Sequence, residues 1–532
     1  MSANLQEITG SQAKTMQVPK RWPLVNTLES RSGDFLKDAR LVNAYGEKDP
    51  VTGEYQVEKR PGFALTPVVA AGGGGGGGIY NYNFFAQFTG QVSTTIYLQG
   101  VQGSLYNAYV IVSNTGGVVS GPTLIGTVSL GITNIFSSSF SNGWPTKAQF
   151  TGLPFSAGGT ANGTIIFSGG GAGSEFPTPP IAVQQAYYYD TTLHTLIPGV
   201  NGFPAQTVPG FVYLDGFTYV MDIAGTIWET ATQNQVANWG VLAFISAATD
   251  ADIGVQLARQ LIYIVAIKQW TTQFFYDAGN PTGSSLSPVP GAQYSFGCLS
   301  SDTFQDLDGV LFWATQSKVG TSRIVQMENL NAKFVSNAAV ERQLDLGPQS
   351  TFYSFAYQHA GHRWYGITNL TTNVTMVYDI SQELWYLWTD FQGNYYPVIG
   401  RAATLFGKEW NQIGATGAIY VLDSDYVFPN DMGNIVPVDI YTPNFDGGVD
   451  RIKFLSQMRF NADQTPGSAL WVRFSEDDYN SWNNFRKVDL ARTRPFINDE
   501  GSFYRRAYHF RHYANTKLRI RSVDLQLDIG TL

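Results

Sequence analysis

Sulfur and charge are scarce in this chain. One cysteine, Cys298, stands among 532 residues, so the chain can form neither an intrachain disulfide nor a zinc site built from several thiolates. Charged residues make up 14% of the sequence, against about 25% in a typical soluble domain. The 33 basic and 41 acidic residues give a net charge of −8, which argues against a protein that coats nucleic acid with its whole surface.

Long apolar runs are missing as well. The first 30 residues lack the apolar core of a signal peptide. The longest apolar run, Leu261–Ile267, is far shorter than the roughly 20 residues that span a bilayer. We therefore expect neither secretion nor stable membrane insertion, and folding in a reducing cytoplasm.

Glycine, in contrast, is abundant, with 56 residues, and aromatic residues make up 14% of the chain. Short aromatic stretches among Gly, Asn, Asp and Ser predict many short strands, so we expect a mostly β protein. Residues 40–45 and 55–57 are predicted strands, joined by a turn at 49–54. The composition changes at Arg60-Pro61, because residues 61–174 carry a single formal charge, Lys147.

An internal repeat follows in residues 181–439. Predicted strands that begin at five positions are separated by 47, 50, 53 and 43 residues: Ile227, Phe274, Ile324, Val377 and Tyr420. Asp215-Gly216 and Asp308-Gly309 lie between apolar runs, where they predict tight hairpin turns. Asp222, Asp277, Asp379 and Asp423 follow strands and are predicted to mark one repeated turn. Units of this length with several short strands are typical of β-propeller blades; a β-sandwich with accidental spacing is the alternative.

A further blade is predicted to start before the repeat, with strands at 95–98 and 103–106 and a closing strand at 187–190. We therefore expect about six blades and five segments. Residues 1–62 and 440–532 would together form a platform domain, and 63–106 would begin the propeller. Residues 107–180 would be an inserted Gly/Ser/Thr-rich β element, and 181–439 would hold the main blades. The seven glycines of 72–78 are expected to form a loop, and no Gly-Lys-Ser/Thr follows them to bind phosphate.

Charge is distributed unevenly along the chain. Residues 450–521 hold fourteen basic and eight acidic residues, whereas 61–449 hold ten basic and 23 acidic residues. Alternating polar and apolar residues at 517–521 and 523–529 predict strands with one wet face.

The five histidines suggest two candidate sites. His359 and His362 flank Gly361, so a surface turn is favoured over a metal pair. His509 and His512 lie among Arg505, Arg506 and Arg511, where cations would repel a metal. That strand is either salt-bridged or an anion site, and neither alternative requires a cofactor.

Three further kinds of motif could belong to an enzyme. Residues 475–482 have the spacing of a sialidase-type Asp-box, with Tyr479 in the place of glycine, and are interpreted as a hairpin turn. The pairs Asp306/Asp308 and Asp423/Asp425 could perform acid/base chemistry on a glycan, although turn acids are common. The clusters 385–388 and 187–189 could stack on sugars, but core packing is the favoured reading.

The N-terminal pattern carries a family resemblance. Residues 35–45, a glycine-containing turn and residues 55–63, which end in Arg60-Pro61-Gly62-Phe63, resemble the opening of the tail nozzle (hub) proteins of short-tailed bacteriophages. These are also called packaged-DNA stabilisation proteins, and in them an Asn-containing strand precedes a Pro-Gly that leads into a β-propeller. Asn43, Arg60, Pro61 and Gly62 match that signature, whereas the Gly-rich segment after Pro61 matches no part of it.

The resemblance implies a structural virion protein without catalytic, cofactor or metal sites. It would be made in the bacterial cytoplasm and assemble as a hexamer into a ring of the virion tail below the head-to-tail adaptor. Tail fibres or spikes and a tail needle would be neighbours. Double-stranded DNA would pass through the ring without sequence recognition. Candidate adaptor contacts are the basic residues near the C-terminus: Arg505, Arg506, Arg511, Lys517, Arg519 and Arg521. An envelope-glycan depolymerase and a receptor-binding propeller remain the alternatives.

Overall fold

The computed structural model describes most of the chain after residue 202 and shorter stretches before it. The described residues are 20–29, 35, 37–50, 53–65, 79–81, 84–88, 90–92, 94–99, 105–112, 123–129, 153–155, 163–167, 187–190, 195–198, 202–204, 207–210, 212–233, 238–247, 252–318, 320, 322–405, 408–413, 419–422, 430–448 and 450–530. Among these described residues, those at 20, 64–65 and within 79–198 and 399–422 are described by their backbone alone. The seven glycines and Asp423/Asp425 lie outside the described residues.

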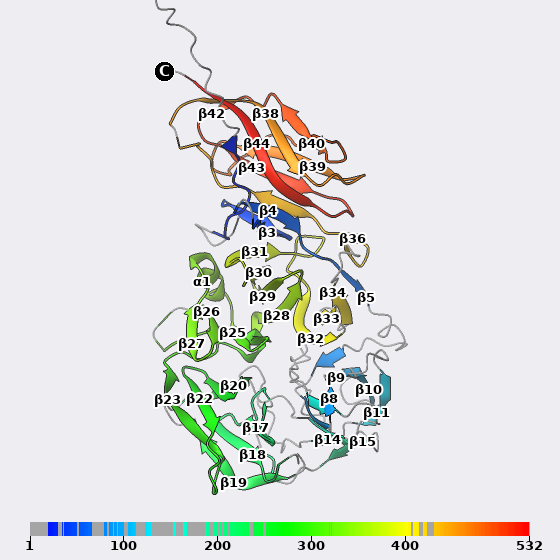
Figure 1. The fold of residues 1–532 in the computed structure, drawn as a ribbon, viewed down its shortest axis with the longest axis vertical. Helices are drawn as coiled ribbons and strands as arrows, with labels where there is room; N and C mark the ends of the chain where they lie inside the picture. Colours follow the sequence, from blue (N-terminus) through cyan, green and yellow to red (C-terminus); the bar gives the residue numbers. More distant parts are fainter. Residues whose placement is uncertain are drawn as a thin grey trace, which may run out of the picture. The chain divides into compact units, whose positions relative to one another are not determined.

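The chain divides into two compact units, and the described elements are mostly strands (Figure 1). Unit 1 takes Met1–Asn26, Leu36–Lys59 and Pro437–Leu532, and so joins segments from both ends of the chain. Unit 2 takes Thr27–Phe35 and Arg60–Val436. The described helices are short and lie in unit 2: η2 (Ser301–Thr303), α1 (Ala338–Leu344) and η3 (Gln349–Thr351).

Unit 1 contains two sets of paired strands. One set runs in the order β3 (Ala44–Lys48), β4 (Tyr55–Lys59), β44 (Arg519–Ile529), β38 (Lys453–Ala462) and β41 (Phe496–Asn498), with β1 (Lys20–Arg21) on β44 and β42 (Ser502–Phe503) on β38. The other set runs β2 (Arg40–Val42), β37 (Val438–Tyr441), β43 (Ala507–His512), β39 (Ala469–Ser475) and β40 (Arg486–Asp489). Phe460 of β38 packs on Phe510 of β43, with ring centroids 5.8 Å apart, so the two sets enclose a common core.

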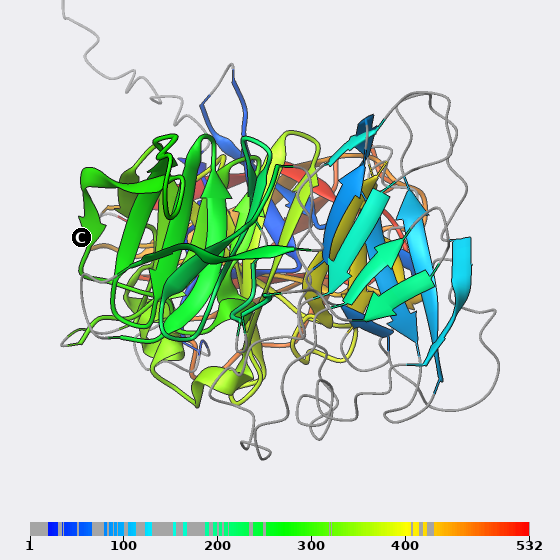
Figure 2. The same cartoon turned by 90° about the horizontal axis from the view of Figure 1, so that it is seen from below.

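Unit 2 repeats one antiparallel pattern in which each strand pairs with the next. The first three sheets are β16 (Val212–Leu214), β17 (Phe217–Met221), β18 (Thr226–Thr230) and β19 (Trp239–Ser246); β20 (Gly254–Gln260), β21 (Tyr263–Lys268), β22 (Thr272–Asp277) and β23 (Leu286–Tyr294); and β24 (Gln305–Leu307), β25 (Val310–Thr315), β26 (Arg323–Glu328) and β27 (Asn331–Phe334). The strands β28 (Phe352–His359), β29 (His362–Asn369), β30 (Val374–Asp379) and β31 (Leu384–Trp388) pair in the same order. Figure 2 shows these sheets, in green, standing side by side.

A fifth group of strands takes one member from the other end of unit 2. The strands β32 (Val398–Leu405), β33 (Lys408–Ile413) and β34 (Ile419–Leu422) are followed in the sheet by β5 (Phe63–Leu65), which pairs antiparallel with β34. The short strands β35 (Asn430–Asp431) and β36 (Asn434–Ile435) complete this sheet. A segment that precedes all the repeats thus lies in the sheet of the last one.

The predicted repeat is confirmed in its position within each sheet. The five positions that define the spacings of 47, 50, 53 and 43 residues all fall in the third strand of their group. These strands are β18, β22, β26, β30 and β34. The predicted hairpins are also present, because Asp215 and Gly216 have φ of 49° and 94°, and Asp308 and Gly309 have 54° and 82°. Two successive positive φ values are those of the tight turn that Asp-Gly favours.

One predicted regularity is wrong. Asp277 and Asp379 end third strands, but Asp222 follows the second strand, β17, where its carboxylate accepts hydrogen bonds from the Thr226 backbone N–H and the Trp228 indole N–H. Asp is suited to turns in general because its short side chain caps nearby backbone N–H groups, so its recurrence does not fix one place in the unit.

The strands before residue 200 group differently from the prediction. The strand β14 (Tyr187–Asp190) lies in a sheet with β7 (Phe84–Phe88), β13 (Gly163–Phe167) and β15 (Thr195–Pro198). The predicted companions at 95–98 and 103–106 instead fall in β9 (Thr94–Gln99) and β10 (Leu105–Val112), which pair with β6 (Ile79–Asn81) and β11 (Thr123–Ser129). The strands β8 (Gly90–Val92) and β12 (Leu153–Phe155) form a separate pair. Similar short β patterns cannot reveal which partner each strand takes.

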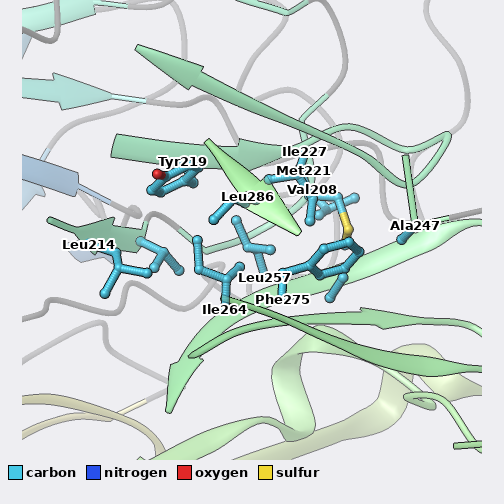
Figure 3. Packing of buried hydrophobic residues seen from close by; sticks show 12 residues of the cluster. Val208, Leu214, Tyr219, Met221, Ile227, Ala247, Leu257, Ile264, Phe275 and Leu286 are labelled. Atoms are coloured by element: carbon cyan, nitrogen blue, oxygen red, sulfur yellow. The ribbon is translucent and has the colours of Figure 1, made fainter. Parts of the chain in front are cut away.

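Apolar side chains fill the space between neighbouring sheets of unit 2. One cluster joins the β16–β19 sheet to the β20–β23 sheet and includes Tyr219, Ile227, Leu257 and Phe275 (Figure 3). A second joins β20–β23 to β24–β27 around Trp313. All six residues of β25 are buried, which is what a strand covered on both faces requires. The observed fold is therefore mostly β, with a propeller-like series of antiparallel sheets.

Gly366 offers a test of this packing. It lies opposite Phe355 in the β28–β29 pair, and a Cβ at Gly366 would lie 2.2 Å from two atoms of the buried Phe355 ring. Gly366→Ala should therefore lower the free energy of unfolding by about 1–3 kcal/mol, as overpacked cores do. Urea denaturation followed by tryptophan fluorescence measures it.

A double-mutant cycle with Phe355→Leu provides the control. If the ring is the obstacle, Gly366→Ala should cost less in the Phe355→Leu background than in the wild type. Equal costs in the two backgrounds would contradict the proposed steric cause.

Candidate functional site

Arg60, the central residue of the predicted signature, is fully enclosed in unit 2. Its two terminal nitrogens bind the Asp431 carboxylate as a fork, at 3.0 Å (Nη1 to Oδ1) and 2.5 Å (Nη2 to Oδ2). Nη1 also donates to the Pro61 carbonyl and Nη2 to the Thr389 carbonyl, both at 3.0 Å. Burial alone would lower the pKa of Arg60, but the carboxylate of Asp431 holds it above the ordinary value. Arg60 therefore stays charged in the interior.

Aromatic rings and strand β5 complete this cluster. The guanidinium carbon of Arg60 lies 4.7 Å from the ring centre of Tyr396 and 5.8 Å from that of Trp388. Pro61 and Gly62 are buried, and they lead directly into β5. Phe63 pairs with Asp431 in β35 as well as with β34. The signature thus fixes the entry of β5 into the last sheet.

Asn43, the fourth signature residue, has a structural role in unit 1. It separates β2 from β3 with a φ of 55°, a conformation that Asn tolerates better than most residues. Its side-chain amide donates to the Pro437 carbonyl at 2.9 Å. Asn43 therefore connects the N-terminal strands to the start of the C-terminal segment.

The six predicted adaptor contacts differ in their exposure. Arg506 is 1% exposed, ion-pairs with Glu476 and lies 3.8 Å from the ring centre of Phe474, so it is part of the core. This removes Arg506 from the candidate surface residues, because its charge already has a partner. The other five are half or fully exposed, and three of them pair with acids within unit 1: Arg505 with Asp478, Arg511 with Asp439 and Arg519 with Asp463. Whether Arg505, Arg511, Lys517, Arg519 and Arg521 contact an adaptor stays a prediction.

His509 belongs to a hydrogen-bonded network on the outer face of the β2–β37–β43–β39–β40 set. Its Nε2 donates to Asp439 Oδ1 at 2.6 Å, and its Nδ1 accepts from Arg473 Nε at 2.8 Å. Burial lowers the pKa of His509 to about 4, so the ring is neutral near pH 7. Asp439 also binds Arg511, and these bonds hold its pKa below the ordinary value despite burial. Of the two alternatives for the strand with His509, a salt-bridged strand or an anion site, these contacts support the salt-bridged strand.

His512 lies on the opposite face of β43 and is also buried. Its Nε2 lies 3.0 Å from Ser468 Oγ and 3.1 Å from Thr516 Oγ1, whereas its Nδ1 has no hydrogen-bond partner among the described residues. Burial, reinforced by the Lys59 ammonium, lowers the pKa of His512 to about 3.

His359 and His362 lie at the β28–β29 hairpin, as the turn prediction required, but they are not on the surface. They are 6% and 4% exposed. His362 Nδ1 lies 2.6 Å from Asp379 Oδ2, and its ring stacks on Trp364 with an interplanar angle of 4°. The prediction of a surface turn is therefore wrong in exposure, because the neighbouring aromatic residues cover both imidazoles.

The Asp-box-like segment is a turn between β39 and β40, as interpreted from the sequence. The exposed Asp477 accepts hydrogen bonds from the Ser475 hydroxyl and from the backbone and hydroxyl of Ser481. These bonds lower the pKa of Asp477 to about 2. Asp478 and Tyr479 have φ of 61° and 66°, which explains why glycine is usual at this position of such a turn. Trp482 packs against Tyr441 and His509.

The remaining candidates are also structural where they are described. Asp306 accepts from the Gly309 backbone within the turn, whereas Asp308 accepts from the amide of Gln358 in β28, so both carboxylates have structural partners. Trp385, Tyr386 and Trp388 are at most 2% exposed, which confirms core packing. The side chains of residues 187–189 lie outside the described part. Among the described residues, no three His, Cys, Asp or Glu side chains are placed to hold a metal ion, and no helix is long and apolar enough to cross a membrane.

Four residues with evident roles were missed by sequence reasoning. Asp431 and Asp439 pair with arginines that are distant in sequence. A local sequence pattern cannot predict such a pair. Trp471 and Arg473 occupy alternate positions in β39, so they share a face with His509 and Arg511 of β43. The alternation around residue 472 was visible in the sequence, but the register with β43 was not.

Comparisons with known proteins leave the family open. No family model matches the chain, and no curated protein sequence matches it. Among solved structures, virginiamycin B lyase from Staphylococcus aureus has a TM-score of 0.35 at 8% identity, covering 64% of this chain and 99% of that chain. The computationally designed Ika8 protein has a TM-score of 0.31 at 12% identity, covering 65% and 99%. Scores this low support no conclusion about the activity of this chain.

The Arg60–Asp431 pair leads to a stability prediction. Arg60→Met should lower the free energy of unfolding by about 3–5 kcal/mol, because it leaves the Asp431 carboxylate buried without its partner. The double variant Arg60→Met/Asp431→Leu should lose less, since the stranded charge is gone. Urea denaturation of the three proteins measures both effects.

An exposed ion pair of the same unit serves as control. Lys333 and Glu383 form a pair whose side chains are 54% and 65% exposed, and Lys333→Met should cost at most about 1 kcal/mol. A loss for Arg60→Met as small as that of the control would contradict the structural role of Arg60.

His512 leads to a prediction about acid stability. The pKa of histidine is near 6.5 in an unfolded chain, whereas that of folded His512 is about 3. Between these two pH values His512 is protonated in the unfolded chain and neutral in the folded protein. Stability should therefore fall as the pH falls through this window, by up to about 1.4 kcal/mol per pH unit. His512→Gln should flatten the dependence, measured as urea midpoints from pH 7 to 4. His509 is present in both proteins, and parallel profiles would refute the assignment.

Proposed function

We propose that this chain is a structural virion protein that forms the tail nozzle of a short-tailed bacteriophage. In this role it forms a ring, a hexamer in our proposal, which extends the tail channel below the head-to-tail adaptor, retains packaged DNA and conducts it during ejection. The chain is made in the host cytoplasm and functions in the virion tail, next to fibres or spikes and a tail needle. It performs no catalysis.

One observation carries the proposal: the role of Arg60-Pro61-Gly62. In the resembling family this signature leads into the propeller. Here Arg60 ion-pairs with Asp431, and the next residues form β5, which pairs with the last repeat. The signature residues therefore have a structural reason to occur together, which supports the resemblance.

A closed propeller of about six blades is part of the proposal. The strand groups that start at β16, β20, β24, β28 and β32 supply five blades, and β7 with β13–β15 supplies the sixth. The β5–β34 pairing favours closure, because a first segment that completes the last blade joins the two ends of a propeller. The β8–β12 strands would then form a peripheral insertion.

Self-association is supported by a strand edge in unit 2 that no described strand pairs with. The strand β19 is the last strand of its sheet, and its irregular middle carries Val241 and Leu242, which are 73% and 79% exposed. An apolar strand edge of this kind invites pairing with another chain unless an assembly covers it. A ring of copies provides that cover.

The charge distribution fits a channel for DNA. Residues 61–449, which include the repeats, hold 23 acidic against ten basic residues. A lumen lined by acidic or neutral side chains repels phosphates and lets DNA slide, whereas a basic lumen would bind it by releasing counterions.

Electron microscopy of the purified full chain, alone and mixed with tail-less particles, tests the proposal. Rings with a central channel that attach to the particles are the expected result. A monomer that cleaves host envelope polysaccharide would establish the depolymerase alternative, and a monomer that binds intact host cells would establish the receptor-binding alternative. Either result would overturn the nozzle proposal.

The exposed β19 residues lead to a specific prediction for assembly. Val241→Asp/Leu242→Asp should shift the chain from rings to monomers, because two charges would be buried without partners at the contact. Mass photometry measures the distribution. Leu346→Asp, at a 45% exposed loop position of the same unit, should leave rings intact. Unchanged rings in the double variant would exclude β19 from the contact.

A further inference from the structure

The outer face of β43, β39 and β40 in unit 1 brings cations and aromatic rings together. The cross-strand register places Asp439, Arg511, Trp471 and Lys487 in one row. The adjacent row contains Tyr441, His509 and Arg473. We call the exposed part, formed by Trp471, Arg473, Phe485, Lys487 and Arg511, the cation–aromatic face.

Contacts beneath this face hold its arginines in position. His509 accepts the Nε hydrogen bond of Arg473, and Asp439 accepts two bonds from Arg511. The Arg473 guanidinium carbon lies 4.5 Å from the ring centre of Phe485. These side chains are therefore preorganised, which reduces the entropy lost when a partner binds.

Arg473, Lys487 and Arg511 retain hydrogen-bond donors that could bind a partner. Lys487 Nζ lies 5.7 Å from the ring centre of Trp471, and neither Lys487 nor Arg473 forms an ion pair with a carboxylate in the described part of the chain. Trp471 is 37% exposed, and the Arg511 side chain is 41% exposed. Three cations thus face one carboxylate, Asp439, which is already satisfied.

We infer that the cation–aromatic face is a docking surface for another protein, whose surface presents separate carboxylates around an apolar side chain that covers Trp471. Exposed Trp and Arg are the residue types that most often dominate protein interfaces. A guanidinium group can form two parallel hydrogen bonds to one carboxylate. The exposed ring of Trp471 supplies apolar contact area between the cations.

The surroundings favour a protein over nucleic acid. The turn between β39 and β40, the two strands that carry Trp471 and Lys487, holds three consecutive acids, Glu476, Asp477 and Asp478. A phosphate backbone carries closely spaced charges and would meet these acids beside the cations. A folded protein can place its carboxylates on the cations alone. This inference concerns unit 1 by itself and goes beyond the proposed function, since ring formation and this surface are tested separately.

Isothermal titration calorimetry of the full chain with poly-L-glutamate at about 50 mM salt tests the surface, since low salt leaves charge contacts unscreened. The wild type should bind the probe. Lys487→Glu and Trp471→Ala should each weaken binding by about tenfold, which corresponds to the loss of one good contact. Both side chains are partly or fully exposed, so their replacement should leave the unfolding temperature unchanged.

The matched control is Arg492→Glu. Arg492 is 71% exposed in the same unit, and its substitution changes the net charge by the same amount as Lys487→Glu. It should alter binding by less than about twofold, because its charge lies outside the face. Hydrogen exchange of the wild type gives a second readout, in which the probe should protect peptides that cover residues 471–487.

Four results would overturn the inference. The first is that the wild type does not bind poly-L-glutamate, and the second is that Arg492→Glu weakens binding as much as Lys487→Glu. The third is that a 20-base-pair DNA duplex binds more tightly through the same residues, which would identify a nucleic-acid site. The fourth is that Lys487→Glu dissociates assembled copies in mass photometry, which would identify a contact between copies of this chain.

Discussion

The buried charge of Arg60 is the constraint on which the architecture of unit 2 depends. A guanidinium in the interior is tolerated only if carboxylate and carbonyl groups satisfy its donors, and here Asp431 lies 371 residues away. The pair can form only when the segment before the repeats meets the segment after them. A local requirement for charge compensation therefore becomes a condition on the whole unit, which Pro61 and Gly62 meet by turning the chain directly into β5.

Packing between neighbouring sheets adds a second constraint in unit 2. Each sheet buries apolar residues against its neighbour, and central strands such as β25 are covered on both faces. The β20–β23 sheet packs against both of its neighbours, so its removal would expose two apolar surfaces. The close approach of Gly366 to Phe355 shows how little space is left, because even a methyl group would collide with the ring. Aromatic residues that could have stacked on a ligand, such as Trp388, are used for this packing instead.

The sequence predicted what depends on local pattern. The third strands of five groups, the Asp-Gly hairpins and the Asp477 turn follow from residue spacing and turn chemistry, and all are present. It could not predict what depends on pairing at a distance. The partners of Arg60 and His509, the burial of His359 and the grouping of β9 and β10 require the register between strands, which alternation leaves open. The sequence therefore placed the candidate surface in the correct C-terminal segment, but its arginines alone did not point to Trp471 and Arg473.

The basic C-terminal segment shows why the net charge of a segment does not measure its capacity to bind. Lys453 is fully buried and donates to two backbone carbonyls, and Arg506 is enclosed by aromatic rings and Glu476. Arg519 and Arg486 have carboxylate partners. Many of the basic side chains in this segment therefore connect strands within unit 1 and are not available to an external partner. The cations that can contact a partner are those with donors left over after their internal hydrogen bonds, and strand register places Arg473, Lys487 and Arg511 near Trp471.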